Sequence, residues 1–148
     1  MAYKDASSTY KETRIKTAGQ GQLIVMLYDE AIRQLIKAIE LLQLNQGDQK
    51  DPGRIEMISK AVMKTEEIIT ELMVSLDFEQ GGEISKNLFS LYTWFNRELM
   101  EANISQDTTR MIAVKDMLCE LRNTWSAVSQ SVVDQPNREA TVGLNIAG

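Results

Sequence analysis

The stretch that decides the fold is Ser75-Leu76-Asp77-Phe78-Glu79-Gln80-Gly81-Gly82-Glu83-Ile84, near the middle of the chain. The apolar spacing on either side of it is typical of helices. Two adjacent glycines can take positive φ angles that would strain a residue with a Cβ. We therefore expect one amphipathic helix to end here and the next to begin at about Glu83, after a tight turn at Gly81-Gly82. Such a turn folds two long helices back on each other.

Apolar residues on both sides of this turn recur at alternating steps of three and four, which places them on one face of a helix. The spacing predicts helices at about 20–45, 52–76, 83–104 and 107–133. The expected core stripes are Ile24, Tyr28, Ala31, Leu35, Ala38 and Leu42; Ile55, Ile58, Val62, Thr65, Ile69, Leu72 and Leu76; Ile84, Leu88, Leu91, Tyr92, Phe95, Leu99 and Ala102; and Met111, Val114, Leu118, Leu121, Trp125, Val128 and Val132.

The connections between these segments are short. Asn45-Gln46-Gly47-Asp48 is a helix stop, Pro52 suits the first turn of the second helix, and Ser105-Gln106-Asp107 supplies polar capping residues. Short connections make successive helices antiparallel. The predicted fold is an all-α, up-down-up-down four-helix bundle in a single domain, 1–148, with a short mobile N-terminal arm at about 1–18 and a loose C-terminal tail at 135–148.

Composition excludes several functional classes. The 148 residues carry a formal charge of −5, which disfavours a nucleic-acid partner. The chain has no histidine, so it cannot build a Ser-His-Asp triad, a Cys-His pair or a Glu-x-x-His metal box. A carboxylate-only magnesium site or a lysine nucleophile stays open in principle, but no spacing points to either. We therefore expect no enzyme activity, no metal and no cofactor.

Three further observations bear on localisation. The lone Cys119 suits a reducing compartment, the first residues lack the apolar core of a signal peptide, and no run of about 18 apolar residues could span a bilayer. These features indicate a cytoplasmic protein without a membrane span.

The first two helices have more apolar residues than one core can use. Leu23 to Leu27 and Ile32 to Leu41 put apolar side chains on several sides of the first helix, and Ile68 to Val74 do so in the second. Surplus apolar surface on a soluble acidic protein indicates a partner site or a self-association face.

Four sequence blocks resemble the FliS family of flagellin-specific export chaperones. They are Thr17-Ala18 with Leu23-Ile24-Val25-Met26-Leu27-Tyr28-Asp29; Ile68-Ile69-Thr70-Glu71-Leu72 with Ser75-Leu76-Asp77, Gly81-Gly82-Glu83-Ile84, Asn87-Leu88 and Leu91-Tyr92; Glu101-Ala102-Asn103; and Leu121-Arg122 with Trp125. The resemblance spans about residues 10–130. The chain departs from the family pattern at Gly19-Gln20-Gly21, where Ser-Pro is usual, and at Glu30, where glycine is usual.

The resemblance implies a helical chaperone that binds the disordered C-terminal segment of flagellin, prevents premature polymerisation and hands it to the type III export apparatus. A flagellar export gate or a co-chaperone is a possible second partner. The implied client-binding residues are the apolar Ile24, Leu27, Tyr28, Ile69, Leu72 and Leu76, the hydrogen-bonding Asn87 and Tyr92, and Tyr10 as the hinge of the N-terminal arm.

Alternative interpretations stay open at this stage. Tyr92 is equally well explained as an aromatic at the core edge, and the N-terminal arm as a frayed terminus. The protein could instead be a homodimeric helical adaptor without a flagellin client. A carboxylate enzyme or metal bundle would use Glu66, Glu67 and Glu71, or Glu98 and Glu101, but solvated helix faces explain those residues better.

Overall fold

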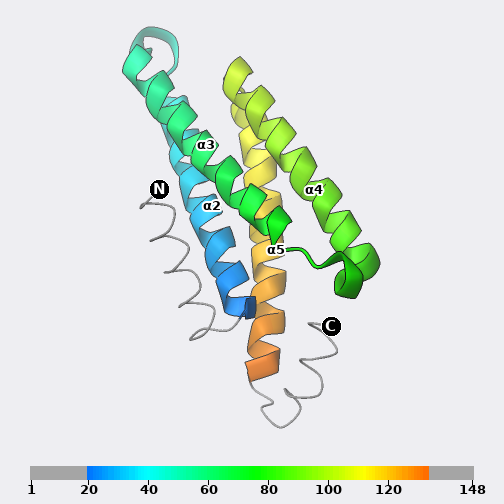
Figure 1. Cartoon of the computed structure of the whole chain (residues 1–148). Helices are drawn as coiled ribbons and strands as arrows, with labels where there is room; N and C mark the ends of the chain where they lie inside the picture. The colour runs from blue at the N-terminus through cyan, green and yellow to red at the C-terminus, as the bar shows by residue number, and fades with distance from the viewer. Residues whose placement is uncertain (1–19, 134–148) are drawn as a thin grey trace, which may run out of the picture.

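The computed structural model describes residues 20–133. Within this range the chain forms helices and no strand: α2 (Gln20–Leu44), the 3₁₀ turn η1 (Gly47–Gln49), α3 (Pro52–Val74), α4 (Phe78–Ser105) and α5 (Thr108–Val133). Figure 1 shows the four long helices running up and down side by side. The predicted all-α four-helix bundle is confirmed. The predicted N-terminal arm and C-terminal tail lie outside the described residues.

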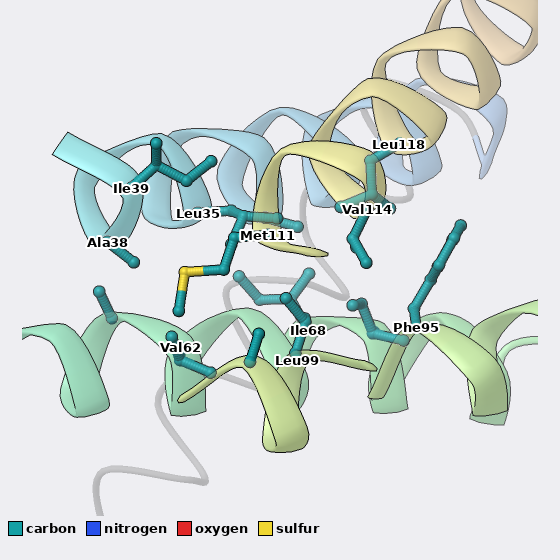
Figure 2. Packing of buried hydrophobic residues seen from close by; sticks show 14 of the residues in the cluster. Leu35, Ala38, Ile39, Val62, Ile68, Phe95, Leu99, Met111, Val114 and Leu118 are labelled. Carbon is teal, nitrogen blue, oxygen red and sulfur yellow. The ribbon is translucent and has the colours of Figure 1, made fainter. Parts of the chain in front are cut away.

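Each helix packs against two neighbours. α2 packs against α3 and α5, and α4 packs against the same two helices from the opposite corner. The core lies between all four, and Figure 2 shows Leu35, Val62, Leu99 and Met111, one from each helix, meeting there. The core stripes therefore face one another as their spacing predicts.

The connection from α2 to α3 is held by polar side chains. Gly47 has a φ of 56°, in the left-handed region. The side-chain oxygen of the buried Asn45 accepts from the backbone N–H of Asp51 at 2.6 Å, and Asp51 accepts from the N–H of Gly53 at 2.9 Å. Asp51 is thus the N-cap of α3, and Pro52 is its first residue, which confirms the predicted place of Pro52 in the first turn.

The connection from α3 to α4 contains one helical segment that the sequence did not predict. α4 begins at Phe78, with Asp77 as its N-cap, but the non-helical Gly82 divides it into this short first segment and a long helix that follows Gly82, as expected for a helix starting at about Glu83. Gly82 has φ 51° and ψ −126°, so it kinks the helix, whereas Gly81 has no positive φ. The chain therefore reverses in two steps, first at Ser75–Asp77 and then at the Gly82 kink.

Three stripe positions expected in the core are exposed: Ile55, Ile84 and Val128. The Ser59 hydroxyl hydrogen-bonds the Asn103 side chain across α3 and α4. Ile55 lies one turn earlier on α3, level with the end of α4, so α4 does not extend far enough to cover it. Ile84 directly follows the kink, and Val128 lies in the last turns of α5. In each case the spacing is right, but the neighbouring helix or turn does not cover the side chain.

Candidate functional site

The apolar stripes become only half-buried at one end of the bundle. The antiparallel arrangement brings together there the start of α2, the end of α3, the start of α4 and the end of α5 (Figure 1). We call this the open end. Its half-buried side chains, which still touch the core, are Ile24, Leu27, Leu76, Leu88, Leu91, Leu121 and Trp125.

Four larger apolar exposures lie around the α3–α4 connection at the same end. Val74 is 81% exposed, Ile84 69%, Phe78 47% and Phe89 42%. We call these four the junction residues. Exposed apolar side chains gathered on one part of a soluble protein mark an interaction surface, whereas scattered single ones need no explanation.

The turn that presents the junction residues is internally braced. The Asp77 carboxylate accepts from the N–H groups of Glu79 and Gln80, both at 3.1 Å, and so caps α4. The carbonyl of Asp77 accepts from the N–H of Gly81 at 2.7 Å and from the Ser85 hydroxyl at 2.9 Å. A Cβ at Gly81 would come within 1.8 Å of the Ser85 Oγ, so glycine is needed here for close approach.

The kink also folds the first turn of α4 back onto the helix. As a result the Phe78 and Phe89 rings meet edge to face, with centroids 5.8 Å apart. The two rings form a small aromatic platform that stays about half exposed. Neither residue is among the client-binding residues predicted from the sequence. The signal for Phe89 was that it is apolar yet lies off the predicted stripe.

Directly beneath this end, two tyrosines link diagonal helices. The hydroxyls of Tyr28 on α2 and Tyr92 on α4 hydrogen-bond to each other inside the core. Burial raises the pKa of the Tyr28 hydroxyl well above its usual range and also raises the pKa of the Tyr92 hydroxyl. The Trp125 side chain hydrogen-bonds the Tyr28 hydroxyl and acts against that rise. These groups satisfy one another and stay neutral at physiological pH.

The structure separates the sequence-predicted client residues into three groups. Ile24, Leu27 and Leu76 are half-buried at the open end, and Asn87 is exposed on α4. Four others are buried in the core, and their part in client binding stays a prediction: Tyr28, Ile69, Leu72 and Tyr92. Their spacing puts them on the inward face of each helix, and Tyr92 uses its hydroxyl within the core. Tyr10 lies outside the described residues.

Two ion pairs lie near the middle of α2. Asp29 pairs with Arg122 of α5 at 2.8 Å, and Glu30 pairs with Arg33 one turn further along at 2.7 Å. Partial burial works to raise the pKa of Glu30, but hydrogen bonds from Gln34 and Arg33 and the charges of Arg33 and Lys64 outweigh it, so the net shift is downward. Glu30, where the family pattern has glycine, is therefore part of an ordered surface network.

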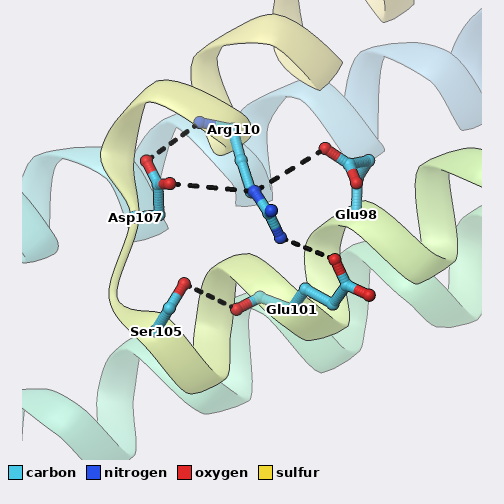
Figure 3. A network of polar contacts seen from close by, with 5 residues as sticks. All are labelled: Glu98, Glu101, Ser105, Asp107 and Arg110. Carbon is cyan, nitrogen blue, oxygen red and sulfur yellow. Dashed lines mark hydrogen bonds and ion pairs between the residues drawn. The ribbon is translucent and has the colours of Figure 1, made fainter.

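Two of the carboxylates considered for an enzyme or metal site, Glu98 and Glu101, belong to an ion-pair network. Arg110 at the start of α5 contacts Glu101 at 2.6 Å, Asp107 at 3.7 Å and Glu98 at 4.0 Å, and so ties α4 to α5 (Figure 3). Among residues 20–133 no group of three or more potential ligands could hold a metal ion. None of the described helices is long and apolar enough to cross a membrane.

Comparison with known proteins adds an independent line of evidence. A family model described as "Flagellar protein FliS" matches residues 2–132. The chain is 35% identical over 127 residues to the flagellar secretion chaperone FliS of Salmonella typhimurium strain LT2, covering 86% of this chain and 89% of that protein. It is 31% identical to the protein of the same name from Escherichia coli K12, with 84% and 88% coverage, and 25% identical to that of Bacillus subtilis 168, with 97% and 99% coverage.

Proposed function

This chain belongs to the FliS family of flagellar proteins, and we propose that it is a cytoplasmic secretion chaperone for flagellin. It binds the disordered, apolar C-terminal segment of newly made flagellin, prevents premature polymerisation and delivers the client to the flagellar type III export apparatus. Its role is binding rather than catalysis. The relatives named above are secretion chaperones, which supports this role.

The observation that supports a binding surface is the apolar exposure at the open end. The client segment lies against the junction residues and the half-buried side chains beside them, including Ile24, Leu27 and Leu76. Asn87, exposed one turn into α4 beyond the kink, offers hydrogen bonds to the client backbone. Ordering a disordered segment is costly, so a long, mainly apolar contact is needed to offset it.

The buried members of the predicted set act indirectly. Tyr28 and Tyr92 hold α2 and α4 at a fixed separation beneath the surface, and Ile69 and Leu72 anchor the end of α3 in the core. Tyr10 remains the proposed hinge of an N-terminal arm that covers the client surface when it is empty. Recognition by the export gate or by a co-chaperone, and formation of a homodimer, are further proposals that this surface does not require.

Calorimetric titration with a peptide covering the last ~50 residues of the organism's own flagellin tests the function. We expect one-to-one binding with a Kd of about 1 μM or tighter, which corresponds to about −8 kcal/mol. Val74→Asp and Phe89→Asp should each weaken binding at least about tenfold, because each places a charge under the apolar client.

Matched controls come from the other end of the bundle. Leu44 and Ile104 are 60% and 78% exposed, within the range of Val74 and Phe89, so Leu44→Asp and Ile104→Asp add the same charge at exposed apolar positions away from the open end. They should leave the affinity within about twofold of the unmodified chain. Equal weakening by all four changes would contradict the open end as the site. No heat and no chemical-shift change with the peptide would overturn the flagellin client, and a dimer seen by sedimentation would then favour the adaptor.

A further inference from the structure

A second surface feature lies between α2 and α3, toward the η1 connection. It is a hollow of about 250 Å³ lined by Gln34, Lys37, Met57, Lys60, Ala61 and Lys64. Three of these six side chains are lysines and none is a carboxylate. On a chain with a formal charge of −5, such a gathering of ammonium groups is unexpected from composition alone. We call it the lysine hollow.

The acidic residues around the hollow leave most of this positive charge available. Lys60 reaches Glu56 at 3.6 Å and Lys64 reaches Glu67 at 4.0 Å, both along the solvent side of α3, where ion pairs are weak. Glu30, which faces Lys64 from α2, is already engaged by Arg33 and Gln34. Lys37 has no ion pair or hydrogen bond within the described part of the chain.

The floor of the hollow is apolar. Ala61 is buried beneath it and Met57 is 47% exposed at its edge. A methionine side chain adapts its shape to what binds against it. The hollow therefore combines a small apolar floor with three flexible cations, contributed by two helices. A compact anion such as phosphate would use the charges but not the floor, and the lining includes no helix N-terminus to supply backbone N–H groups.

We propose that the lysine hollow binds an acidic segment of a partner protein, with carboxylates contacting Lys37, Lys60 and Lys64 and one apolar side chain lying against Met57. This site goes beyond the proposed client surface. Lys37 is thirteen residues after Ile24 on α2, about 20 Å along the helix. An acidic partner and an apolar client could therefore occupy the bundle together, and loss of one site need not affect the other.

The first test is fluorescence anisotropy with a labelled acetyl-Glu-Glu-Leu-Glu-Glu peptide at about 50 mM salt, where charge attraction is only partly screened. Lys37→Glu with Lys60→Glu should weaken binding at least about tenfold. The matched control is Lys86→Glu with Arg97→Glu, which changes the charge equally at two exposed cations of α4. It should weaken binding less than about twofold. Circular dichroism checks that all variants stay helical.

The floor is tested separately. Met57→Ala should lower the affinity for the peptide about threefold. A peptide with serine in place of leucine should show a similar loss of affinity for the unmodified chain. Three results would each overturn the proposal. The first is an equal loss of affinity in the α4 control variant, and the second is competition by inorganic phosphate at concentrations similar to the peptide's. The third is preferential binding of the chain to phosphatidylserine vesicles. The flagellin titration repeated on the double-lysine variant should be unchanged, which separates failure of this site from failure of the proposed function.

Discussion

The same apolar stripes run to both ends of the bundle, but their side chains are buried to different extents at the two ends. At the end that contains η1 and the α4–α5 connection, the stripe residues Leu42, Ile58, Ala102 and Met111 are all fully buried. We call this the closed end. At the open end most of the corresponding positions are only half-buried, among them Ile24, Leu88 and Trp125, although Leu72 near the end of α3 is buried. A stripe therefore tells which side chains are apolar but not whether a neighbour covers them.

The connections explain the difference. At the closed end, Asn45 and Asp51 brace the α2–α3 turn, and Arg110 joins three carboxylates across the α4–α5 turn. At the open end α3 stops at Val74, and the kink at Gly82 turns the start of α4 aside. The start of α2 and the end of α5 extend beyond that point, where α3 and α4 no longer lie beside them (Figure 1). These connections explain why the stripes are covered more completely at the closed end than at the open end.

The largest expected effect is on stability and compares matched leucines at the two ends. Leu42→Ala removes a fully buried side chain at the closed end and should lower the free energy of unfolding by about 2–5 kcal/mol. Leu88→Ala, at the half-buried open end, should cost about half as much, because water already reaches part of its surface. Urea denaturation measures both. Equal losses would mean that the two ends are packed alike.

A second prediction concerns the tyrosine pair beneath the open end. Tyr28→Phe should lower stability by about 1–3 kcal/mol, because it leaves the Tyr92 hydroxyl buried without its partner, and Tyr92→Phe should cost less, because Trp125 still hydrogen-bonds the Tyr28 hydroxyl. The double variant should lose less than the sum of the two single losses. A denaturation cycle of the four proteins measures this coupling. Strict additivity would show that the hydroxyls do not depend on each other.

The kink gives a smaller expected effect that is confined to the open end. Gly82→Ala should destabilise the chain by about 1 kcal/mol or somewhat more, because φ 51° with ψ −126° suits only glycine. Gly53→Ala is the control, since Gly53 lies in the first turn of α3 without a positive φ. Hydrogen exchange should speed up around Phe78 and Phe89 but not at the closed end. Unchanged exchange there would contradict a kink that positions the junction residues.

The smallest effects come from two glutamates whose pKa values shift in opposite directions. The lowered pKa of Glu30 stabilises the fold at neutral pH, and that contribution is lost as the pH falls through the folded-state pKa. Glu30→Gln should therefore lower the free energy of unfolding by about 0.5 kcal/mol or less at pH 7, and this loss should approach zero in acid.

Glu66 should behave in the opposite way. Burial raises its pKa, so its charged form opposes folding at neutral pH, and this penalty disappears as the pH falls through the folded-state pKa. Glu66→Gln should then stabilise the chain at neutral pH, with a gain that shrinks in acid. Thermal unfolding of both variants from about pH 3 to 7 spans the usual glutamate pKa and measures the two trends. If both substitutions changed the stability at neutral pH in the same direction, the opposite pKa shifts of Glu30 and Glu66 would be refuted.

Much of the candidate site could be predicted only in outline. The sequence predicted surplus apolar residues on the first two helices, including Ile68 to Val74 on the second, and Val74 is exposed. Phe78 and Phe89 were missed because their exposure depends on where α4 begins and bends. Ile69, Leu72, Tyr28 and Tyr92 were assigned to the surface by family resemblance, although their places in the stripes already indicated the core.

The sequence by itself determined the four helices, their antiparallel order, the start of α3 at Pro52 and the family, because helix periodicity and turn residues are local properties of the chain. Only the tertiary structure decided which stripe positions are covered, where α4 starts, and that Lys37 meets Lys60 and Lys64 around one hollow. Those features depend on how far each helix extends beside its neighbour. The physical reason is that burial and charge proximity are set by contacts between distant segments, which spacing within one helix does not encode.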